Sequence, residues 1–324
     1  MNEAGYQTAI VGKWHLGHNK PEYLPLQRGF DQQYGHYNGA LDYFTHIRDG
    51  GHDWHKNDKR NDDEGYATDL IGREAARIIA DHDKSKSLFL YVPFNAPHTP
   101  LQAPQKYIDR YPDMPMRRSV YAAMVTCMDD AIGTIVDALN ENEFPEKNTL
   151  IFFCSDNGGI PSLGSNRELR ASKGTLYEGG VRVPAVMVLP GRIKAGSEVN
   201  EPLHIVDLLP TLAPLCYLNT KKCQPLDGKN GWATITRGEP SPHEFILLNA
   251  TPFHGAIRMG DWKLIRNGHV SANNTAKPKK QSWELFNIAD DPSEKTDLKD
   301  EHPEIFAKLK AKLAELSKEA VKPN

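Results

Sequence analysis

The residues of this 324-residue chain best suited to catalysis are cations and imidazoles that follow short apolar runs. Lys13 and His15 follow the run 8–11, and His98 follows the run 88–94. Lys13 and His15 are two residues apart, so an extended backbone would place both side chains on one face. An ammonium group beside a titratable imidazole suits an anionic substrate whose leaving group needs a proton. A surface lysine beside a hydrogen-bonded histidine explains this pair equally well.

Two hard oxygen ligands stand together at Asp156 and Asn157, directly after the apolar run 150–154. Carboxylate and amide oxygens suit Ca²⁺ or Mg²⁺. A plain turn accounts for the same residues, because Asn-Gly is a common turn dipeptide. Lys173 lies in a glycine-containing segment, 170–182, whose glycines suggest backbone packed closely against a neighbour. Taken alone, Lys173 fits a solvated lysine.

A pair of histidines, His52 and His55, has a spacing that could also bind a metal. The stretch around them, 46–63, is dense in His, Asp, Asn, Lys and Gly. This composition predicts an exposed loop, with both imidazoles in solvent.

The elements that must position these residues are predicted to form an α/β sandwich. The runs 88–94, 150–154 and 183–189 are short, β-rich and nearly continuously apolar, and a shorter run covers 8–11. This pattern predicts central strands of a mostly parallel sheet flanked by helices. Between the runs, apolar residues recur every three or four positions over 70–79 and 120–139, which predicts amphipathic helices.

All the candidate residues except Lys173 lie just past the carboxyl ends of predicted strands. In open α/β sheets, ligands bind at that edge. We therefore expect Lys13, His15, His98, Asp156 and Lys173 to line one cleft.

The sequence pattern changes near residue 241. Short strand candidates cover 245–248, 256–259 and 262–265, and a closing helix has Pro303 near its start. The sequence thus predicts a domain over residues 1–240 and a small antiparallel C-terminal subdomain with a helix over 241–324.

Bulk composition excludes several classes of partner. A net charge of −3 gives no broad basic surface for nucleic acid, and no apolar stretch approaches the roughly 18 residues of a membrane helix. Four cysteines are too few for a disulfide scaffold, although Cys216 and Cys223 flank a polar loop and could pair in an oxidising compartment. The oligomeric state stays open.

Together the motifs resemble those of type I sulfatases in the alkaline phosphatase superfamily. Residues 5–17 (GYQTAIVGKWHLG) resemble the second sulfatase signature, and the segments APHTP (96–100), SDNGG (155–159), KGTLYEGG (173–180) and HIVDLLPTL (204–212) follow in the family's order. The likeness runs from Gly5 to about Leu298. The segments RGFD (28–31), LDYF (41–44) and PLQAP (100–104) are similar to the arylsulfatase B, or N-acetylgalactosamine-4-sulfatase, group.

The resemblance implies an alkaline-phosphatase-like fold and hydrolysis of the sulfate esters of aryl or sugar substrates. It implies that Asp156 and Asn157 ligate Ca²⁺, with Mg²⁺ as the alternative, and that Lys13, His15, His98 and Lys173 surround the sulfate. The implied partner is a sulfated small molecule or glycan. The implied location of the family member is periplasmic, secreted or lysosomal.

The family's nucleophile is a Cys or Ser in a C/S-x-P-S/A-R motif, oxidised to formylglycine, and no residue here fits it. Cys223-Gln-Pro-Leu-Asp227 has the proline but lacks the small residue and the arginine. The family also places an Asp-Asp metal pair upstream of the nucleophile, and nothing before Gly5 matches that pair. We therefore expect an N-terminal part of the pattern, with one or more central strands, to be missing, and the 324-residue chain to be inactive by itself.

Two alternatives remain from the sequence. A phosphatase or phosphonate hydrolase of the same superfamily would use two metals and more His and Asp ligands, whereas Asp156 followed by Asn157 favours a one-metal sulfatase. A non-catalytic pseudo-sulfatase that binds sulfated glycans fits the missing nucleophile. A dinucleotide-binding protein is disfavoured, because no G-x-G-x-x-G opens a helix after a strand.

Overall fold

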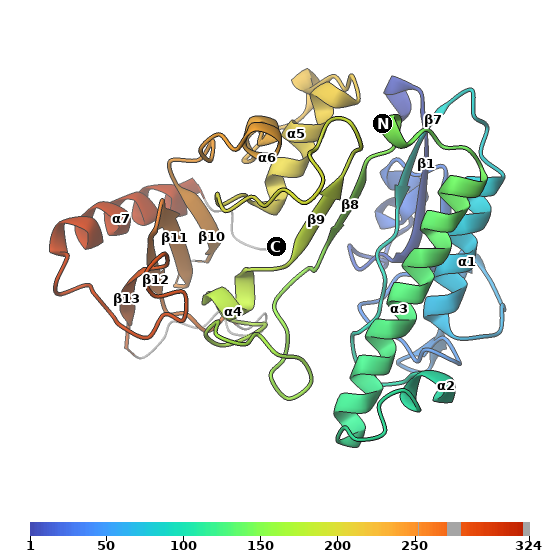
Figure 1. Cartoon of the computed structure of the whole chain (residues 1–324), viewed down its shortest axis with the longest axis horizontal. Coiled ribbons are helices and arrows are strands. Elements are labelled where there is room, and N and C mark those ends of the chain that lie inside the picture. The colour runs from blue at the N-terminus through green and yellow to red at the C-terminus, as the bar shows by residue number, and fades with distance from the viewer. Residues whose placement is uncertain (252, 271–279, 320–324) are drawn as a thin grey trace. The chain divides into compact units, whose positions relative to one another are not determined.

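The structure is a computed structural model and describes residues 1–251, 253–270 and 280–319 (Figure 1). The chain divides into two compact units. The first comprises Met1–Pro145 and Ala213–Lys222, and the second comprises Glu146–Leu212 and Cys223–Asn324. The division into domains at residue 240 stays a prediction.

A five-stranded sheet with the order β6-β5-β2-β1-β7 organises the first unit. Its strands are β1 (Tyr6–Lys13), β2 (Gln32–His36), β5 (His55–Lys56), β6 (Lys59–Arg60) and β7 (Ser87–Tyr91). β1 runs parallel to β2 and to β7, whereas β5 and β6 form an antiparallel edge. The strands predicted at 8–11 and 88–94, and their place in a parallel sheet, are confirmed.

Two long helices, α1 (Ala67–Ala80) and α3 (Met116–Glu141), lie side by side over one face of this sheet (Figure 1). Ala9 and Val11 of β1 share a buried cluster with side chains of both helices, while Ile10 packs with Trp14 and Tyr37 in a separate cluster. This alternation follows from the two-residue period of a strand. Both helices were predicted from their apolar spacing and are confirmed.

The helix α3 passes the test of length and apolar composition for a membrane-spanning helix. It buries Ala123, Met124 and Cys127 in the same cluster as apolar side chains of α1. This packing buries part of the helix, 28% of its most apolar 18-residue stretch.

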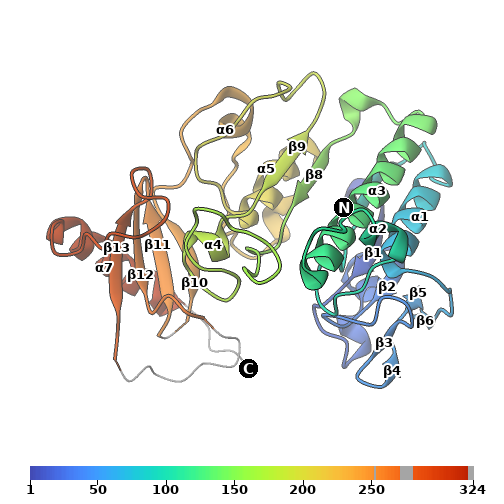
Figure 2. The ribbon, with the colours of Figure 1, turned by 60° about the horizontal axis from the view of Figure 1, so that its bottom comes forward.

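The stretch 46–63 is mostly exposed, as predicted, but it folds into two short hairpins (Figure 2), and His52 and His55 are half-buried, not in solvent as expected. β3 (Ile47–Arg48) pairs with β4 (Gly51–His52), and β5 pairs with β6. Trp54 is fully buried, and its ring stacks between the rings of His36 and His46. A stretch of polar residues is therefore anchored by one aromatic ring between two imidazoles, which composition alone does not reveal.

In the second unit, β8 (Ile151–Cys154) and β9 (Ala185–Val188) form an antiparallel ribbon. The expectation that both are buried strands of a parallel sheet is wrong. A continuous apolar run predicts a strand with apolar surroundings, but the strand direction depends on the connecting chain, which here turns back over residues 155–184. Among the described residues, neither strand pairs with a third strand, and their apolar side chains are partly exposed.

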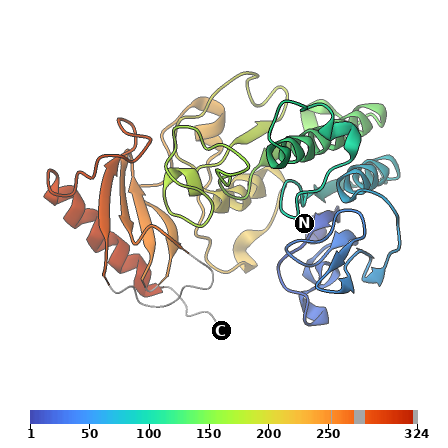
Figure 3. The same cartoon turned by 90° about the horizontal axis from the view of Figure 1, so that it is seen from below.

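A four-stranded antiparallel sheet and a helix complete the second unit (Figure 3). In order the strands are β10 (Ile246–Ala250), β11 (Gly255–Met259), β12 (Trp262–Arg266) and β13 (Trp283–Asn287), and the helix α7 is Pro303–Leu316. Leu309 and Leu313 of α7 pack on one face of the sheet, and Leu176 and Tyr177 contact the other. The predicted antiparallel subdomain with its helix is confirmed.

The remaining elements are short. They are the helices α2 (Gln105–Ile108), α4 (Glu178–Val181), α5 (Leu208–Leu215) and α6 (Trp232–Arg237), and the 3₁₀ helices Asn2–Ala4, Pro21–Tyr23, Pro25–Arg28, Glu146–Asn148, Ile205–Asp207, Thr220–Lys222 and Ser317–Glu319.

Candidate functional site

The ends of β1 and β2 and the segment after β7 meet at one edge of the first unit. Lys13 lies opposite His36 in the parallel register, and its N–H donates to the carbonyl of Pro93 at 2.8 Å. Gly12 and Gly35 have φ of 135° and 127°, and a Cβ on either would lie 2.2 Å from a carbonyl oxygen of the neighbouring segment. Only glycine permits so close an approach in this conformation. The two glycines therefore hold the candidate lysine among three converging backbones.

His15 lies just beyond this edge in a turn, not in the extended backbone expected from the sequence. β1 ends at Lys13, and His15 has a left-handed φ of 53°. Its N–H donates to the carbonyl of Tyr37 at 3.0 Å, and the N–H of Trp14 donates to the carbonyl of His36 at 2.9 Å. The turn after β1 is thus held along the segment that follows β2.

His98 lies in the segment after β7, and a hydrogen bond fixes the role of one of its ring nitrogens. The Nδ1 atom lies 2.8 Å from the carbonyl oxygen of Thr99, so Nδ1 carries the proton and donates. The N–H of His98 donates to Asn95 O, and its carbonyl accepts from the hydroxyl of Tyr43, both at 2.9 Å. Nε2 is then the atom that would accept or deliver a proton.

Sequence reasoning missed two buried polar side chains at this edge, His36 and Asn95. They are 0% and 3% exposed, and among the described residues neither side chain has a hydrogen-bond partner. Burial lowers the pKa of His36 to about 4. The carboxylate of Asp53 opposes this lowering of the pKa, and the nearby charge of Lys13 adds to it, so the ring is neutral at pH 7. Such unsatisfied groups each cost about 1–3 kcal/mol. The one sequence signal was the place of Asn95, directly after an apolar run.

In the second unit, the loop that carries Asp156 and Asn157 follows β8 and rests on α4. The N–H of Gly158 donates to the carbonyl of Gly180 at 3.0 Å, and a Cβ on Gly158 would lie 1.8 Å from the carbonyl oxygen of Gly179. Gly179 and Gly180 belong to the segment 170–182, so the close packing predicted from the glycines of that segment is confirmed. Asp156 is exposed and Asn157 is half-buried.

Lys173 lies in the segment before α4, with its side chain exposed. Two backbone hydrogen bonds clamp this segment to the chain after β12. They run from the N–H of Leu176 to the carbonyl of Gly268 at 2.7 Å, and from the N–H of Val270 to the carbonyl of Gly174 at 2.8 Å. The backbone around Lys173 is therefore fixed while its ammonium group reaches solvent.

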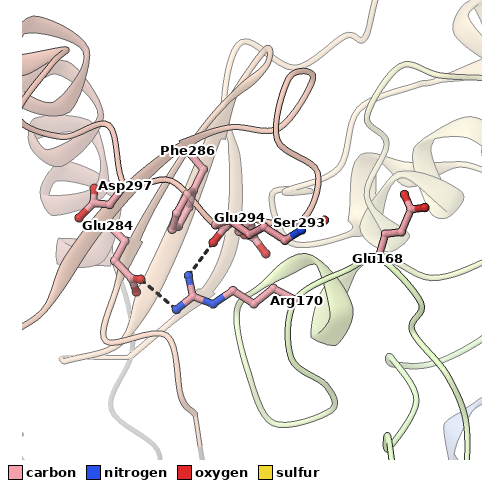
Figure 4. Close-up of a pocket in the computed structure, with 8 residues that line it drawn as sticks. Glu168, Arg170, Glu284, Phe286, Ser293, Glu294 and Asp297 are labelled. Carbon is pink, nitrogen blue, oxygen red and sulfur yellow. Dashed lines mark hydrogen bonds and ion pairs between the residues drawn. The ribbon is translucent and has the colours of Figure 1, made fainter.

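A cavity of about 440 Å³ beside this segment contains none of the predicted site residues (Figure 4). Its lining residues are Glu168, Arg170, Glu284, Phe286, Ser293, Glu294, Lys295 and Asp297. The guanidinium of Arg170 donates to Glu294 O at 2.8 Å and to Glu284 Oε1 at 3.1 Å, and lies 4.0 Å from the centre of the Tyr177 ring. Its charge is paired within the protein, so Arg170 braces the Lys173 segment against β13.

A fully buried lysine, Lys263 of β12, ties α4 to the C-terminal sheet. Its Nζ lies 2.7 Å from Glu178 Oε1 and 3.0 Å from Glu294 Oε1, and the N–H of Glu178 donates to Glu294 Oε2 at 2.6 Å. Burial raises the pKa of Glu294, and the charge of Lys263 opposes that rise. The triad thus supports α4, on which the Asp156 loop rests.

Asp156 and Asn157 suit a hard cation by donor type but supply only part of its shell. Ca²⁺ takes about six to eight oxygen ligands. In the part of the chain that the structure describes, no three His, Cys, Asp or Glu side chains are grouped so that they could hold a metal ion. The four cysteines, including Cys216 and Cys223, are free thiols.

The six predicted site residues fall into two groups. Lys13, His15 and His98 belong to the first unit, and Asp156, Asn157 and Lys173 belong to the second. Within each unit, hydrogen bonds and glycine contacts place the three residues on neighbouring segments. The meeting of the two groups in one cleft stays a prediction.

Comparison with known proteins gives matches along nearly the whole chain. Residues 1–216 match the family model described as Sulfatase, and residues 171–319 match the model described as N-sulphoglucosamine sulphohydrolase, C-terminal. Arylsulfatase J of Mus musculus is 36% identical over 99% of this chain and 62% of its own length. N-acetylgalactosamine-6-sulfatase of Mus musculus is 32% identical over 81% of this chain and 52% of its own length.

Among solved structures, that of Ps i-CgsB in complex with k-i-k-neocarrahexaose is similar over 98% of this chain and 72% of that chain. The sequence identity is 33% and the TM-score is 0.86. The chain thus spans less than two thirds of the two mouse relatives and nearly three quarters of this neighbour.

Proposed function

The chain belongs to the sulfatase family, and from this premise we propose that its residues form the sulfate-binding and cation-binding parts of a sulfuric ester hydrolase. The likeness to Ps i-CgsB confirms the expected alkaline-phosphatase-like α/β fold. The observation that carries the proposal is the junction of β1 with the segment after β7. There the N–H of Lys13 bonds to Pro93 O, and this segment continues to His98.

The side chains have distinct roles in this proposal. The ammonium groups of Lys13 and Lys173 neutralise the sulfuryl oxygens, and His15 hydrogen-bonds to the sulfate. His98 donates through Nδ1 to Thr99 O, so its protonated ring presents Nε2–H to the leaving oxygen. Lys173 is the alternative proton donor.

The metal and the nucleophile complete the chemistry. Asp156 and Asn157 would hold Ca²⁺, or Mg²⁺, and a bound cation would neutralise further charge on the sulfuryl oxygens. The family's formylglycine has no matching C/S-x-P-S/A-R motif within residues 1–324. These residues therefore bind the ester and protonate the leaving group, but none of them makes the attack on sulfur.

We propose a sulfated sugar as the substrate. One mouse relative is named N-acetylgalactosamine-6-sulfatase, and the structure of Ps i-CgsB is a complex with k-i-k-neocarrahexaose. Both names point to carbohydrate. His15 of the first unit and Lys173 of the second are both exposed, so each could contact such a sugar.

The test is hydrolysis of 4-nitrocatechol sulfate and of a sulfated galactosamine glycan. We expect no turnover by residues 1–324 and clear turnover by a longer form that carries the motif, made in a host that oxidises the cysteine. Turnover by residues 1–324, free of host sulfatase, would require a nucleophile among residues assigned here to structure. Glycan binding without turnover by either form would favour the non-catalytic binding protein.

A further inference from the structure

The ring of His15 lies against the turn that follows β2, at Gly39. A Cβ on Gly39 would lie 2.5 Å from Nε2 and 2.6 Å from Cε1 of His15. The φ of Gly39 is not in the left-handed region, so backbone conformation does not require glycine there. The requirement is space, because a side chain at this position would displace the imidazole.

The carboxylate of Asp53 holds this turn in place. Its Oδ1 accepts the N–H of Tyr37 at 3.0 Å, and its Oδ2 accepts both the N–H and the side-chain amide of Asn38 at 2.9 Å. The Nε2 of His55 lies 3.2 Å from Oδ1. Burial alone would raise the pKa of Asp53, but these hydrogen bonds outweigh it and lower the pKa, so the carboxylate is ionised at neutral pH.

Asp53 is itself fixed by the hairpins that cover β2. The next residue, Trp54, is fully buried, with its ring 4.5 Å from that of His46 and 6.2 Å from that of His36, centre to centre. The ring of Tyr37 stacks on that of His55 at 4.2 Å. The turn against His15 is thus anchored by charge-assisted hydrogen bonds and by stacked rings.

We propose that Asp53 and Gly39 are positioning residues that fix the direction of the His15 imidazole. The chain of contacts runs from Asp53 to the backbone of Tyr37 and Asn38, and from there to the N–H and the ring of His15. The left-handed φ of His15 supports this assignment, because strained backbone persists where its surroundings determine it and is common at functional sites. The statement that the ring points toward a bound sulfate rests on the proposed function, whereas the fixing of the ring by Asp53 and Gly39 does not.

The first arm of the test needs no activity. Residues 1–324 labelled with ¹⁵N-histidine give imidazole resonances by NMR, and the His15→Gln variant assigns those of His15. We expect Asp53→Asn and Gly39→Ala each to shift the His15 ring resonances. Gly39→Ala changes no charge, so its shift reports displacement of the ring and not a lost electrostatic interaction.

Two matched controls accompany these variants. Asp62→Asn makes the same chemical change on the same pair of hairpins, where Asp62 bonds to Arg60 and its side chain is 69% exposed. Gly133→Ala adds the same methyl group where nothing lies within 4 Å. Both controls should leave the His15 resonances in place. Unmoved resonances in folded Gly39→Ala and Asp53→Asn would overturn the positioning role.

The second arm uses the catalytically complete form, by which we mean a longer form that carries the C/S-x-P-S/A-R motif and is made in a host that oxidises its cysteine. We expect Asp53→Asn and Gly39→Ala to lower kcat about 10- to 100-fold, since small misplacements of a catalytic group have effects of this order. In a His15→Ala background neither should have a further effect. If no form hydrolyses sulfate esters, the proposed function fails while the NMR result still decides the positioning. Shifted resonances with unchanged kcat in an active enzyme would overturn the proposal that the fixed His15 ring points toward the sulfate.

Discussion

At the scale of single residues, the hydrogen bond from His98 to Thr99 O leaves Nε2 of His98 as the proposed proton donor. This role can be tested by comparing substrates whose leaving groups differ in their need for a proton. In the catalytically complete form, His98→Ala should lower kcat by about 10²–10⁴-fold for a sugar sulfate, whose alkoxide leaving group needs a proton. The loss should be smaller for 4-nitrocatechol sulfate, because its phenolate leaves without one. Steady-state kinetics with both substrates measures the difference, and His302→Ala serves as the control. Equal losses would show that His98 binds sulfate and does not transfer the proton.

His36 gives the first unit a pH dependence of known sign. Burial lowers its pKa to about 4, below about 6.5 in an unfolded chain. The unfolded state therefore binds more protons between these values, so stability present above pH 6.5 is lost as the pH falls toward 4. We expect the free energy of unfolding to fall by about 2 kcal/mol from pH 7 to pH 5 through this group.

His36→Phe keeps a ring beside Trp54 and removes the titration. Urea unfolding at pH 7 and pH 5 should show a decline smaller by that amount in the variant. Part of the decline should remain, because burial lowers the pKa of His46, His204 and His254 as well. His302→Phe, at a half-exposed position, should leave the decline unchanged. An undiminished decline in His36→Phe would mean that this ring is solvated in the native state.

At the scale of elements, the contact of α1 with α3 depends on a glycine. A Cβ on Gly72 would lie 2.9 Å from the Cβ of Ala131, whereas nothing lies within 4 Å of one on Gly133 in the same helix pair. Gly72→Ala should destabilise the fold by about 1–3 kcal/mol through overpacking. Gly133→Ala should stabilise it by about 0.5–1 kcal/mol, because alanine favours a helix. Denaturant unfolding of both variants decides this, and a stabilising Gly72→Ala would show that the helices can move apart freely.

The attachment of α4 to β12 depends on the buried lysine. Lys263→Met leaves Glu178 and Glu294 buried without their cation, so it should lower the free energy of unfolding by about 3–5 kcal/mol. Lys299→Met removes an ammonium group whose partners Asp297 and Asp300 are partly or largely exposed, so it should change this free energy little. Chemical denaturation compares the two. Similar small effects would mean that water reaches the triad.

The helices and parallel strands of the first unit were predictable because each carries its own apolar period. The direction of β8 and β9 was not, because it depends on the path of residues 155–184. The burial of Trp54, which stacks on His36 and His46, and of Asp53, which binds the backbone of Tyr37 and Asn38, was hidden by their polar neighbours in the sequence.

Much of the candidate site was visible as motifs after strands, because those motifs carry their own sequence signal. His36 and Asn95 were not recognised, because what distinguishes them is burial without a partner, a property of tertiary packing. His15 was expected in extended backbone and lies in a left-handed turn, because β1 ends two residues earlier. Sequence therefore supplied the candidate residues, whose roles stay predictions, but it did not predict the backbone conformation of His15.

At the scale of the whole molecule, the two units predict two unfolding transitions. Gly72 and Ala131 lie in the first unit, and Lys263 with its two glutamates lies in the second. Gly72→Ala should therefore shift one transition in denaturant, and Lys263→Met should shift the other. Tryptophan fluorescence and circular dichroism together follow both. A single transition that both variants shift equally would show that the chain unfolds as one cooperative body.

The β8–β9 ribbon leads to an expectation about residues 1–324 in concentrated solution. Phe153 pairs with Val186 and Ile151 with Val188, and these four side chains are 36–57% exposed. They form an apolar strip on one face, and among the described residues each strand has an unpaired edge. Open apolar edges pair with other chains, and a net charge of −3 gives little repulsion against that. We therefore expect residues 1–324 to self-associate through this ribbon as their concentration rises, while each chain is still folded.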